Sequence, residues 1–146
     1  MKIALACSKG GHLQEMYKLE DAWSKYDHFF ITYDSVRTRA LKDRKYLITH
    51  PTDGCIKYVL TIMWQIPKVI LEKPDVLLST GMGWTDIFLF PVCRLIGTHT
   101  IYVESLANVD EISGTAKLVR KFANRFLVQW PKLAEEIGAE YHGGLL

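Results

Sequence analysis

The sequence has few cysteines, little net charge and no long apolar run, and each shortage excludes a class of protein. Its three cysteines, Cys7, Cys55 and Cys93, are odd in number and widely spaced, without a C-x-x-C pair. This pattern argues against a zinc site or a disulfide framework and suits a reducing cytosol. The net charge of +2 is too small by itself to indicate a nucleic-acid partner. No stretch approaches eighteen uncharged apolar residues, and Met1 leads directly into an apolar segment, so we expect neither a membrane-spanning helix nor a signal peptide.

The two standard nucleotide-binding fingerprints, G-x-G-x-x-G and G-x-x-x-x-G-K-[ST], are not met at the first glycine turn. Internal repeats, low-complexity segments and linkers are also missing. A chain of 146 residues, 49% of them hydrophobic, is long enough to bury a real core. We therefore predict a single domain over residues 1–146.

The first twenty residues contain a compact motif. Lys2 to Cys7 is an apolar run too short for a core helix and predicts a buried strand. Gly10, Gly11 and His12 follow, and an amphipathic pattern then indicates a helix. The free amide groups at a helix start favour an anion such as phosphate, and the glycines allow a ligand to touch the main chain. The alternative is a tight turn with a solvated histidine at its tip.

Strand and helix patterns alternate along the rest of the chain. The predicted strands are 28–33, 46–49, 75–79, 99–103 and 126–130, and the predicted helices are 55–73, 86–96, 114–124 and 132–137. Residues 139–146 are predicted as one more short strand or a tail. This alternation predicts an α/β fold, a Rossmann-like and mostly parallel sheet with helices on both faces.

Polar and glycine residues follow three of the predicted strands. Gly81 and Gly83 come after the fourth strand, and Glu104 and Ser105 come after the fifth. Ligands in parallel α/β sheets gather beyond the carboxyl ends of the strands, so we expect these residues to meet His12 at one edge. Ordinary strand-to-helix turns would explain the glycines, but they explain a carboxylate at a strand end less well.

The predicted helix over residues 55–73 is apolar around most of its circumference. Its polar residues, including Lys57 and Lys68, fall on a narrow stripe, with Trp64 at the edge of the stripe. A tryptophan beside a lysine at such a boundary is typical of an interfacial anchor, which favours contact with a membrane surface or a partner chain. The alternative is a helix buried between the sheet and another helix. Pro67 is expected to kink this helix or end it early.

The segment from Ser35 to Lys45 is polar and basic. Arg37 and Arg39 are part of it, and it is either a solvated helix or loop or a patch that meets anionic headgroups or phosphates.

At these motifs the sequence resembles the N-terminal half of GT-B glycosyltransferases. Gly10-Gly11-His12, Gly81-x-Gly83 and the stretch from Val103 to Pro131 are similar to the membrane-anchoring, acceptor-side subunit of the two-chain N-acetylglucosamine transferase of the dolichol pathway. Bacterial counterparts of that subunit act in capsule and exopolysaccharide synthesis. The likeness covers nearly the whole chain.

The resemblance implies that this chain is half of an enzyme. A separate catalytic subunit, resembling the C-terminal GT-B half, would supply most of the UDP-sugar site, and this chain would bind the lipid-linked sugar acceptor. The complex would lie at the cytoplasmic face of the membrane. Eukaryotic relatives begin with a transmembrane helix that this sequence lacks, so peripheral contact is expected. Leu145 and Leu146 belong to a tail that docks on the partner in the related enzyme, and GT-B enzymes work without a bound metal or other cofactor.

The residues fit such an acceptor. Gly10, Gly11 and the helix start would hold a diphosphate, with Gly81, Gly83 and Ser105 beside it. Glu104 is our first candidate for catalysis, either by orienting His12 or by accepting the proton, and His12 is the second because it can act as a base near neutral pH. Two alternatives stay open: an adaptor that activates a transferase without a catalytic group, and a self-contained nucleotide-binding domain.

Overall fold

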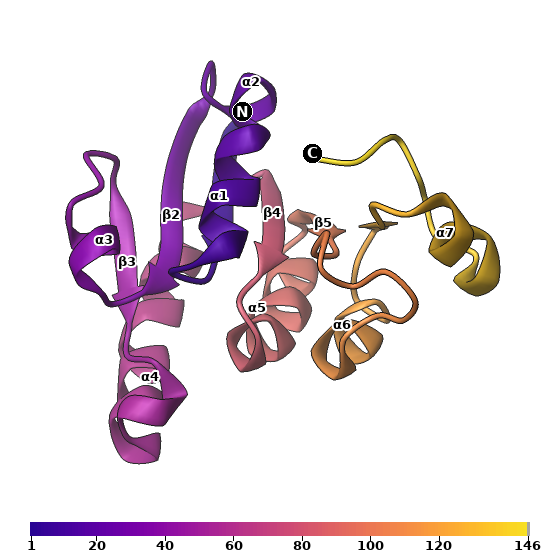
Figure 1. Cartoon of the computed structure of the whole chain (residues 1–146). Coiled ribbons are helices and arrows are strands. Elements are labelled where there is room, and N and C mark those ends of the chain that lie inside the picture. Colours follow the sequence, from indigo (N-terminus) through magenta and orange to yellow (C-terminus); the bar gives the residue numbers. More distant parts are fainter. Residues whose placement is uncertain (146) are drawn as a thin grey trace.

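The chain folds around a six-stranded parallel sheet. A computed structural model describes residues 1–145. The strands are β1 (Lys2–Cys7), β2 (Asp27–Tyr33), β3 (Lys45–Ile48), β4 (Val76–Gly81), β5 (His99–Val103) and β6 (Arg125–Leu127). Their order is β3-β2-β1-β4-β5-β6, and every neighbouring pair is parallel. The predicted Rossmann-like fold is confirmed (Figure 1).

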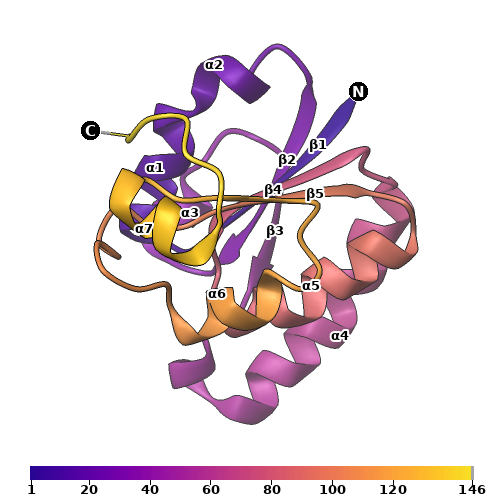
Figure 2. The ribbon, with the colours of Figure 1, turned by 90° about the vertical axis from the view of Figure 1, so that its right-hand side faces the viewer.

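Helices cover both faces of the sheet, as Figure 2 shows. They are α1 (Gly11–Lys18), α2 (Glu20–Trp23), α3 (Val36–Arg39), α4 (Cys55–Glu72), α5 (Trp84–Leu95), α6 (Gly114–Val119) and α7 (Pro131–Ile137), with a short 3-10 turn η1 (Pro51–Asp53). Side chains of β1 alternate between two buried clusters: Ala4 and Ala6 pack with α4, α5 and α6, whereas Leu5 and Cys7 pack with α1 and α2. This alternation is the period-two pattern of a strand that is buried on both faces.

Four predicted features differ from the structure. The sixth strand ends at Leu127, where its pairing with β5 also ends, and a single parallel bridge between Leu127 and Glu140 is found where a seventh strand was one prediction. The helix after Gly114 ends at Val119 rather than Asn124.

The α4 helix continues through Pro67 to Glu72, so the expected early end is wrong. Ile66 and Val69 are buried on either side of the exposed proline, and their packing holds this part of the helix against the sheet.

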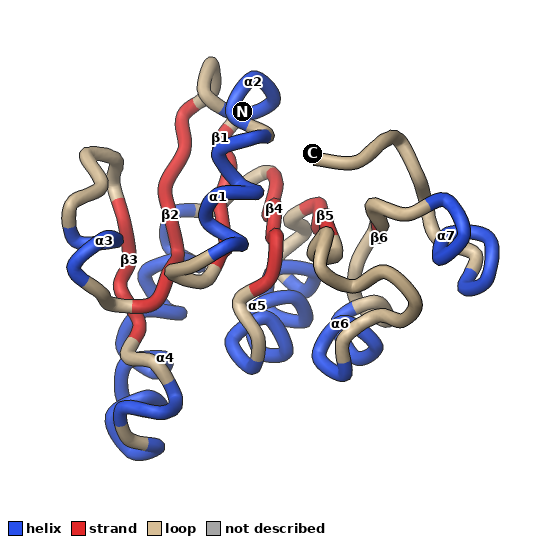
Figure 3. The backbone as a smooth tube through the Cα atoms, in the orientation of Figure 1, coloured by secondary structure: helices blue, strands red, loops and turns tan. Residues whose placement is uncertain are grey.

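The pairing of β1 with β4 shifts by one residue at its carboxyl end. Ala6 pairs with Ser79, but Cys7 pairs with Gly81, so Thr80 is the extra residue of a β-bulge. The amide of Ser8 donates to the carbonyl of Gly81 at 2.9 Å. The bulge therefore brings the β4–α5 loop against the β1–α1 loop, and Figure 3 shows both loops at the same edge of the sheet.

Candidate functional site

The ring of His12 lies directly over Gly81. A Cβ atom at position 81 would be 3.0 Å from Cε1 and 3.1 Å from Nδ1 of this ring, and the φ of Gly81 is +116°. Thr80 Oγ1 donates to the main-chain carbonyl of His12 at 2.7 Å. The structure thus joins the two glycine loops through a histidine that only a glycine can face at this distance.

Both loops line a cavity of about 340 Å³ at the carboxyl edge of the sheet. Its lining consists of Ser8, His12, Tyr33, His50, Pro51, Thr52, Gly81, Gly83 and Trp84. The Tyr33 hydroxyl donates to the carbonyl of Met82 at 2.5 Å, and burial raises the pKa of this phenol to about 12. Within residues 1–145, no group of three or more His, Cys, Asp and Glu side chains is arranged to hold a metal ion.

Gly10 and Gly11 lie in the sequence between two residues that line this cavity, Ser8 and His12, but are not part of its lining. A Cβ at either position would meet nothing within 4 Å. Gly11 is the first residue of α1, and Gly10 before it provides no side-chain cap. The Leu13 amide donates to the carbonyl of Gly10 at 3.2 Å, whereas the amides of Gly11 and His12 have no hydrogen-bond partner within residues 1–145.

Glu15 is the hydrogen-bond partner of His12, and sequence analysis missed it. Its Oε2 lies 3.2 Å from His12 Nδ1, and its Oε1 accepts from Ser105 Oγ at 3.1 Å and from the amide of Leu106 at 2.8 Å. The hydrogen bond to Glu15 raises the pKa of His12, although burial opposes the rise. Burial raises the pKa of Glu15 too, but its hydrogen bonds outweigh this effect and lower the pKa overall.

Glu104 has a different position from the one expected. Its side chain is 1% exposed; Oε1 accepts from the Ser105 amide at 3.0 Å and from Asn108 Nδ2 at 2.8 Å, and Oε2 accepts from the Ser113 amide at 3.1 Å. The prediction that Glu104 orients His12 is wrong, because Glu15 has that place. Residues alternate along a strand, so Glu104 follows Tyr102 onto the α5–α6 face of the sheet, whereas His12 belongs to α1 on the other face.

Asp86 holds the second glycine loop from inside. It is fully buried, and it accepts from the amide of Met82 at 2.6 Å and from Ser79 Oγ at 3.1 Å. Burial raises the pKa of Asp86 to about 7, against the lowering effect of these two hydrogen bonds. The β4–α5 loop is thus held in place by a carboxyl group that is buried in the protein and is not exposed in the cavity.

The outer side of α4 is apolar and exposed. Only Tyr58, Ile66 and Val69 of its eighteen residues are buried, so the alternative of a helix buried between the sheet and another helix is wrong. Trp64 is 69% exposed, and Lys68 Nζ lies 4.8 Å from the centre of its ring. Lys57 is also exposed.

The adjacent α5 adds two exposed aromatic side chains. Trp84 and Phe88 are 63% and 51% exposed, and Trp84 also lines the cavity beside His12. We define the α4–α5 surface as the exposed apolar residues Ile56, Leu60, Met63, Trp64, Trp84 and Phe88. In the described part of the chain, no helix has both the length and the apolar character needed to span a bilayer.

The structure separates Arg37 and Arg39 from this surface. Both are on α3, Arg39 pairs with Asp34 at 2.5 Å, and Leu41 just beyond α3 packs with the α1–α2 cluster on the opposite face of the sheet. The two segments predicted to meet a membrane or partner therefore lie in distinct regions of the protein.

Of the two C-terminal leucines, Leu145 contacts its own chain and Leu146 lies outside the described residues. The Leu145 amide donates to Gln129 Oε1 at 2.8 Å, and its carbonyl accepts from Lys18 Nζ at 2.7 Å.

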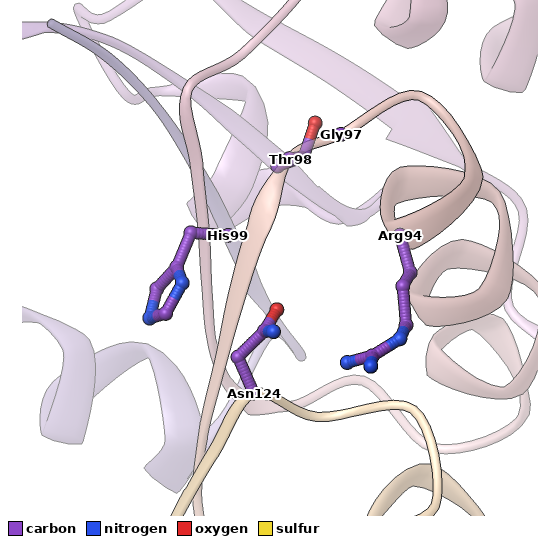
Figure 4. A pocket seen from close by; sticks show the side chains of 5 residues that line it. All are labelled: Arg94, Gly97, Thr98, His99 and Asn124. Atoms are coloured by element: carbon purple, nitrogen blue, oxygen red, sulfur yellow. The ribbon is translucent and has the colours of Figure 1, made fainter.

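A second cavity of about 290 Å³ lies at the opposite edge of the sheet, at the amino end of β5. Figure 4 shows Arg94 and Asn124 facing one another across it. Asn124 Oδ1 accepts from the amide of Thr100 at 2.9 Å, so this side chain serves the connection into β5. The cavity shares no lining residue with the one at His12.

Comparison with known proteins agrees with the expected resemblance. Proteins described as "UDP-N-acetylglucosamine transferase subunit ALG14" are similar: that of Yarrowia lipolytica is 45% identical over 81 residues, covering 51% of this chain and 38% of its own length. That of Mus musculus is 24% identical over 170 aligned residues, covering 93% of this chain and 78% of its own length. The chain thus spans well under half of the Yarrowia relative, and 43% of the similar protein of Candida albicans.

Solved structures show the same fold. MurG of Acinetobacter baumannii superposes with a TM-score of 0.71 at 12% identity, covering 91% of this chain and 43% of that one. The UDP-GlcNAc 2-epimerase of Methanocaldococcus jannaschii gives a TM-score of 0.70 at 14% identity, covering 98% of this chain and 45% of that one. The family model described as "Oligosaccharide biosynthesis protein Alg14 like" matches residues 45–146, and the chain belongs to this family.

Proposed function

We propose that the chain is the acceptor-side subunit of a UDP-sugar-dependent glycosyltransferase, completed by a separate catalytic subunit that resembles the C-terminal half of a GT-B enzyme. The product would be a lipid-linked oligosaccharide or, as in the bacterial counterparts, a capsular or extracellular polysaccharide. The observation that carries the proposal is the His12 ring seated on Gly81 in a cavity built by two glycine loops. The relatives' description as subunits supports a second chain.

The chemistry of this edge suits a lipid-diphosphate-sugar acceptor. Its diphosphate would lie at the open start of α1, beside Gly10 and Gly11. As the acceptor oxygen bonds to C1 of the donor sugar, its proton passes to His12, the bond from C1 to UDP breaks, and UDP leaves with the bonding electrons. A raised pKa makes His12 a stronger base in this step. Gly83 lines the same cavity, Ser105 donates its hydroxyl to Glu15, and Glu104 contributes by holding the 105–113 loop.

Activity of the two-chain complex tests His12. His12→Ala should lower kcat by about a hundredfold or more, because a positioned base contributes about 10²–10⁴. His99→Ala is the matched control, since His99 is exposed at the opposite edge of the sheet. Transfer of labelled sugar from UDP to a lipid-linked acceptor is measured with the two subunits co-purified. Unchanged turnover in both His12→Ala and Glu104→Ala, with loss of activity when the chain is omitted, would establish the adaptor alternative instead.

The α4–α5 surface would hold the complex at the cytoplasmic face of the membrane. Trp84 connects the cavity with the apolar surface, so the lipid of an acceptor bound at His12 can continue toward Trp64. A tryptophan with a lysine over its ring is suited to the boundary between headgroups and acyl chains.

Vesicle sedimentation tests this contact. Trp64→Ser combined with Trp84→Ser should reduce binding of the chain to vesicles of mixed neutral and anionic lipid by about tenfold or more, because each indole loses its burial among the lipids. Leu95→Ser is the control, because this side chain is 86% exposed at the far end of α5. The surface would be assigned to the partner chain by two results together. The double variant and Leu95→Ser would bind vesicles equally, and only the double variant would fail to co-purify with the catalytic subunit.

A further inference from the structure

Glu15 joins three segments of the chain around His12. Its side chain is buried on the first turns of α1, and it lies three residues after His12, on the same side of the helix. One carboxylate oxygen faces Ser105, Leu106 and Gln129, with Gln129 Nε2 at 3.4 Å, and the other faces His12 alone. Gln129 Nε2 also donates to the main-chain carbonyl of Glu104 at 3.0 Å, and this second hydrogen bond holds the side-chain amide of Gln129 in place.

The contact with Glu15 decides which nitrogen of His12 is the base. An ionised carboxylate only accepts hydrogen bonds, so His12 Nδ1 must carry a proton to bond with it. In the neutral ring this leaves Nε2 unprotonated. Nε2 forms no hydrogen bond with any residue between 1 and 145, and the ring lines the cavity.

We propose that Glu15 is the positioning residue of His12, holding the ring over Gly81 with Nδ1 as donor so that Nε2 receives the proton of the acceptor hydroxyl. The arrangement of carboxylate, imidazole and substrate hydroxyl is a general one for a histidine base. The activity part of this inference rests on the proposed function. The part that concerns the ring does not.

Hydrogen bonding to the loop at Ser105 and Leu106 does not require Glu15 to be charged. Ser105 and Leu106 donate to a single oxygen, which a neutral glutamine would also provide. Thr80 and Gly81 of β4 also contact His12, and the carboxyl of Asp86 on α5 is occupied by Ser79 and Met82. The other titratable groups that line the cavity with His12 are the phenol of Tyr33 and the ring of His50, and neither is a carboxylate. Glu15 is therefore the carboxylate in direct contact with the ring, and its hydrogen bond is the main cause of the raised pKa of His12.

Nuclear magnetic resonance of the chain alone tests the position. The ¹⁵N shifts of the His12 ring should show the Nδ1–H tautomer at high pH in the unmodified protein, and the pKa of His12 should fall in Glu15→Gln. Glu20→Gln, which removes an exposed carboxylate of α2, should leave the pKa unchanged. A neutral ring protonated at Nε2 would overturn the proposal without any variant, and so would equal His12 pKa values in the unmodified chain and a folded Glu15→Gln.

Kinetics of the two-chain complex tests the consequence. Glu15→Gln should lower kcat by about tenfold or more with little change in KM, and the acid limb of the pH profile should move to lower pH with the His12 pKa. A Glu15→Gln complex with unchanged kcat and pH profile would overturn the positioning role. An inactive unmodified complex, together with the expected ring tautomer, would instead count against the proposed function and leave the position of the ring intact.

Discussion

The two glycine loops at the site have similar sequences and different constraints. In the β1–α1 loop, Gly10 and Gly11 have negative or helical backbone angles and open space where a Cβ would be. In the β4–α5 loop, Gly81 and Gly83 have φ values of +116° and +59°, and Gly81 is covered by the His12 ring. The first loop has open space at both glycines, whereas in the second loop the space over Gly81 is occupied by the His12 ring.

Side chains at the start of the following helix reinforce the difference. The α1 helix begins without a side-chain cap or an acidic residue in its first turn. The α5 helix has buried Asp86 in its first turn, bonded back to Met82 and Ser79. A pair of glycines after a strand of such a sheet can therefore either pack under a side chain of the protein or leave space for a ligand. The groups around the glycines decide between these two roles.

The largest difference between the loops should appear when Gly81 is replaced. Gly81→Ala places a methyl group 3.0 Å from the His12 ring and forces a backbone angle that alanine rarely adopts. We expect the free energy of unfolding to fall by about 1–3 kcal/mol and kcat of the complex to fall by about tenfold or more.

Gly97→Ala is the matched control for this variant. Gly97 has a φ of +84° with nothing within 4 Å of a Cβ, so the substitution has the backbone cost without the contact with His12. Urea unfolding and transfer assays on both variants separate the two effects. Equal kcat in the two variants would show that the ring does not depend on Gly81.

A smaller effect concerns the carboxyl that fixes the second loop. The folded-state pKa of Asp86 is about 7, above the ordinary value of 3.8, so the folded protein holds this proton more tightly than the unfolded chain does. The resulting stabilisation is complete below pH 3.8 and is lost as the pH rises through 7, with a slope of at most about 1.4 kcal/mol per pH unit.

Asp86→Asn should remove this part of the pH dependence. Urea unfolding at several pH values measures it, with Asp21→Asn as the exposed control. A pH dependence that survives in Asp86→Asn would assign it to other groups.

The smallest effect is expected at Gly11. Gly11→Ala replaces the first residue of α1 by a better helix former, so stability should change by less than about 1 kcal/mol and in the favourable direction. If the acceptor diphosphate lies there, KM for the acceptor should rise a few fold while kcat stays constant. Gly114→Ala is the matched control, because Gly114 is the first residue of α6 and a Cβ there would also meet nothing within 4 Å. It should change the free energy of unfolding by a similar amount and leave KM for the acceptor unchanged. The same KM in both variants would move the diphosphate elsewhere.

Sequence reasoning was most successful where hydrophobic periodicity decides the structure. The six strands and the position of α4 follow from runs and stripes of apolar residues, and the edge where Gly81 and His12 meet follows from parallel topology. The side-chain contacts did not follow. The position of Glu104 at the end of a strand on this edge predicts it as a partner of His12, but strand alternation turns it to the other face.

Glu15 was overlooked because it looks like an ordinary polar residue on an amphipathic helix. Its spacing of three residues from His12 was the available signal, since residues at this distance share one side of a helix. The contacts with Ser105 and Gln129 depend on loops whose paths only the folded structure defines. Helix ends such as Val119 also depended on tertiary packing.

The bulge at Thr80 makes the length of the chain before Gly81 as important as its composition. Apolar substitutions within β4 keep the count of residues between Val76 and Gly81, and with it the meeting of Gly81 with His12. Deleting one residue would leave Gly81 opposite Cys7 in a regular ladder but remove the bulge, and with it the added local twist of the strand at the point where Gly81 meets the ring. Across related sequences, gaps should therefore be rarer in this short stretch than changes of residue, and an alignment that opens one there would misplace the floor of the site.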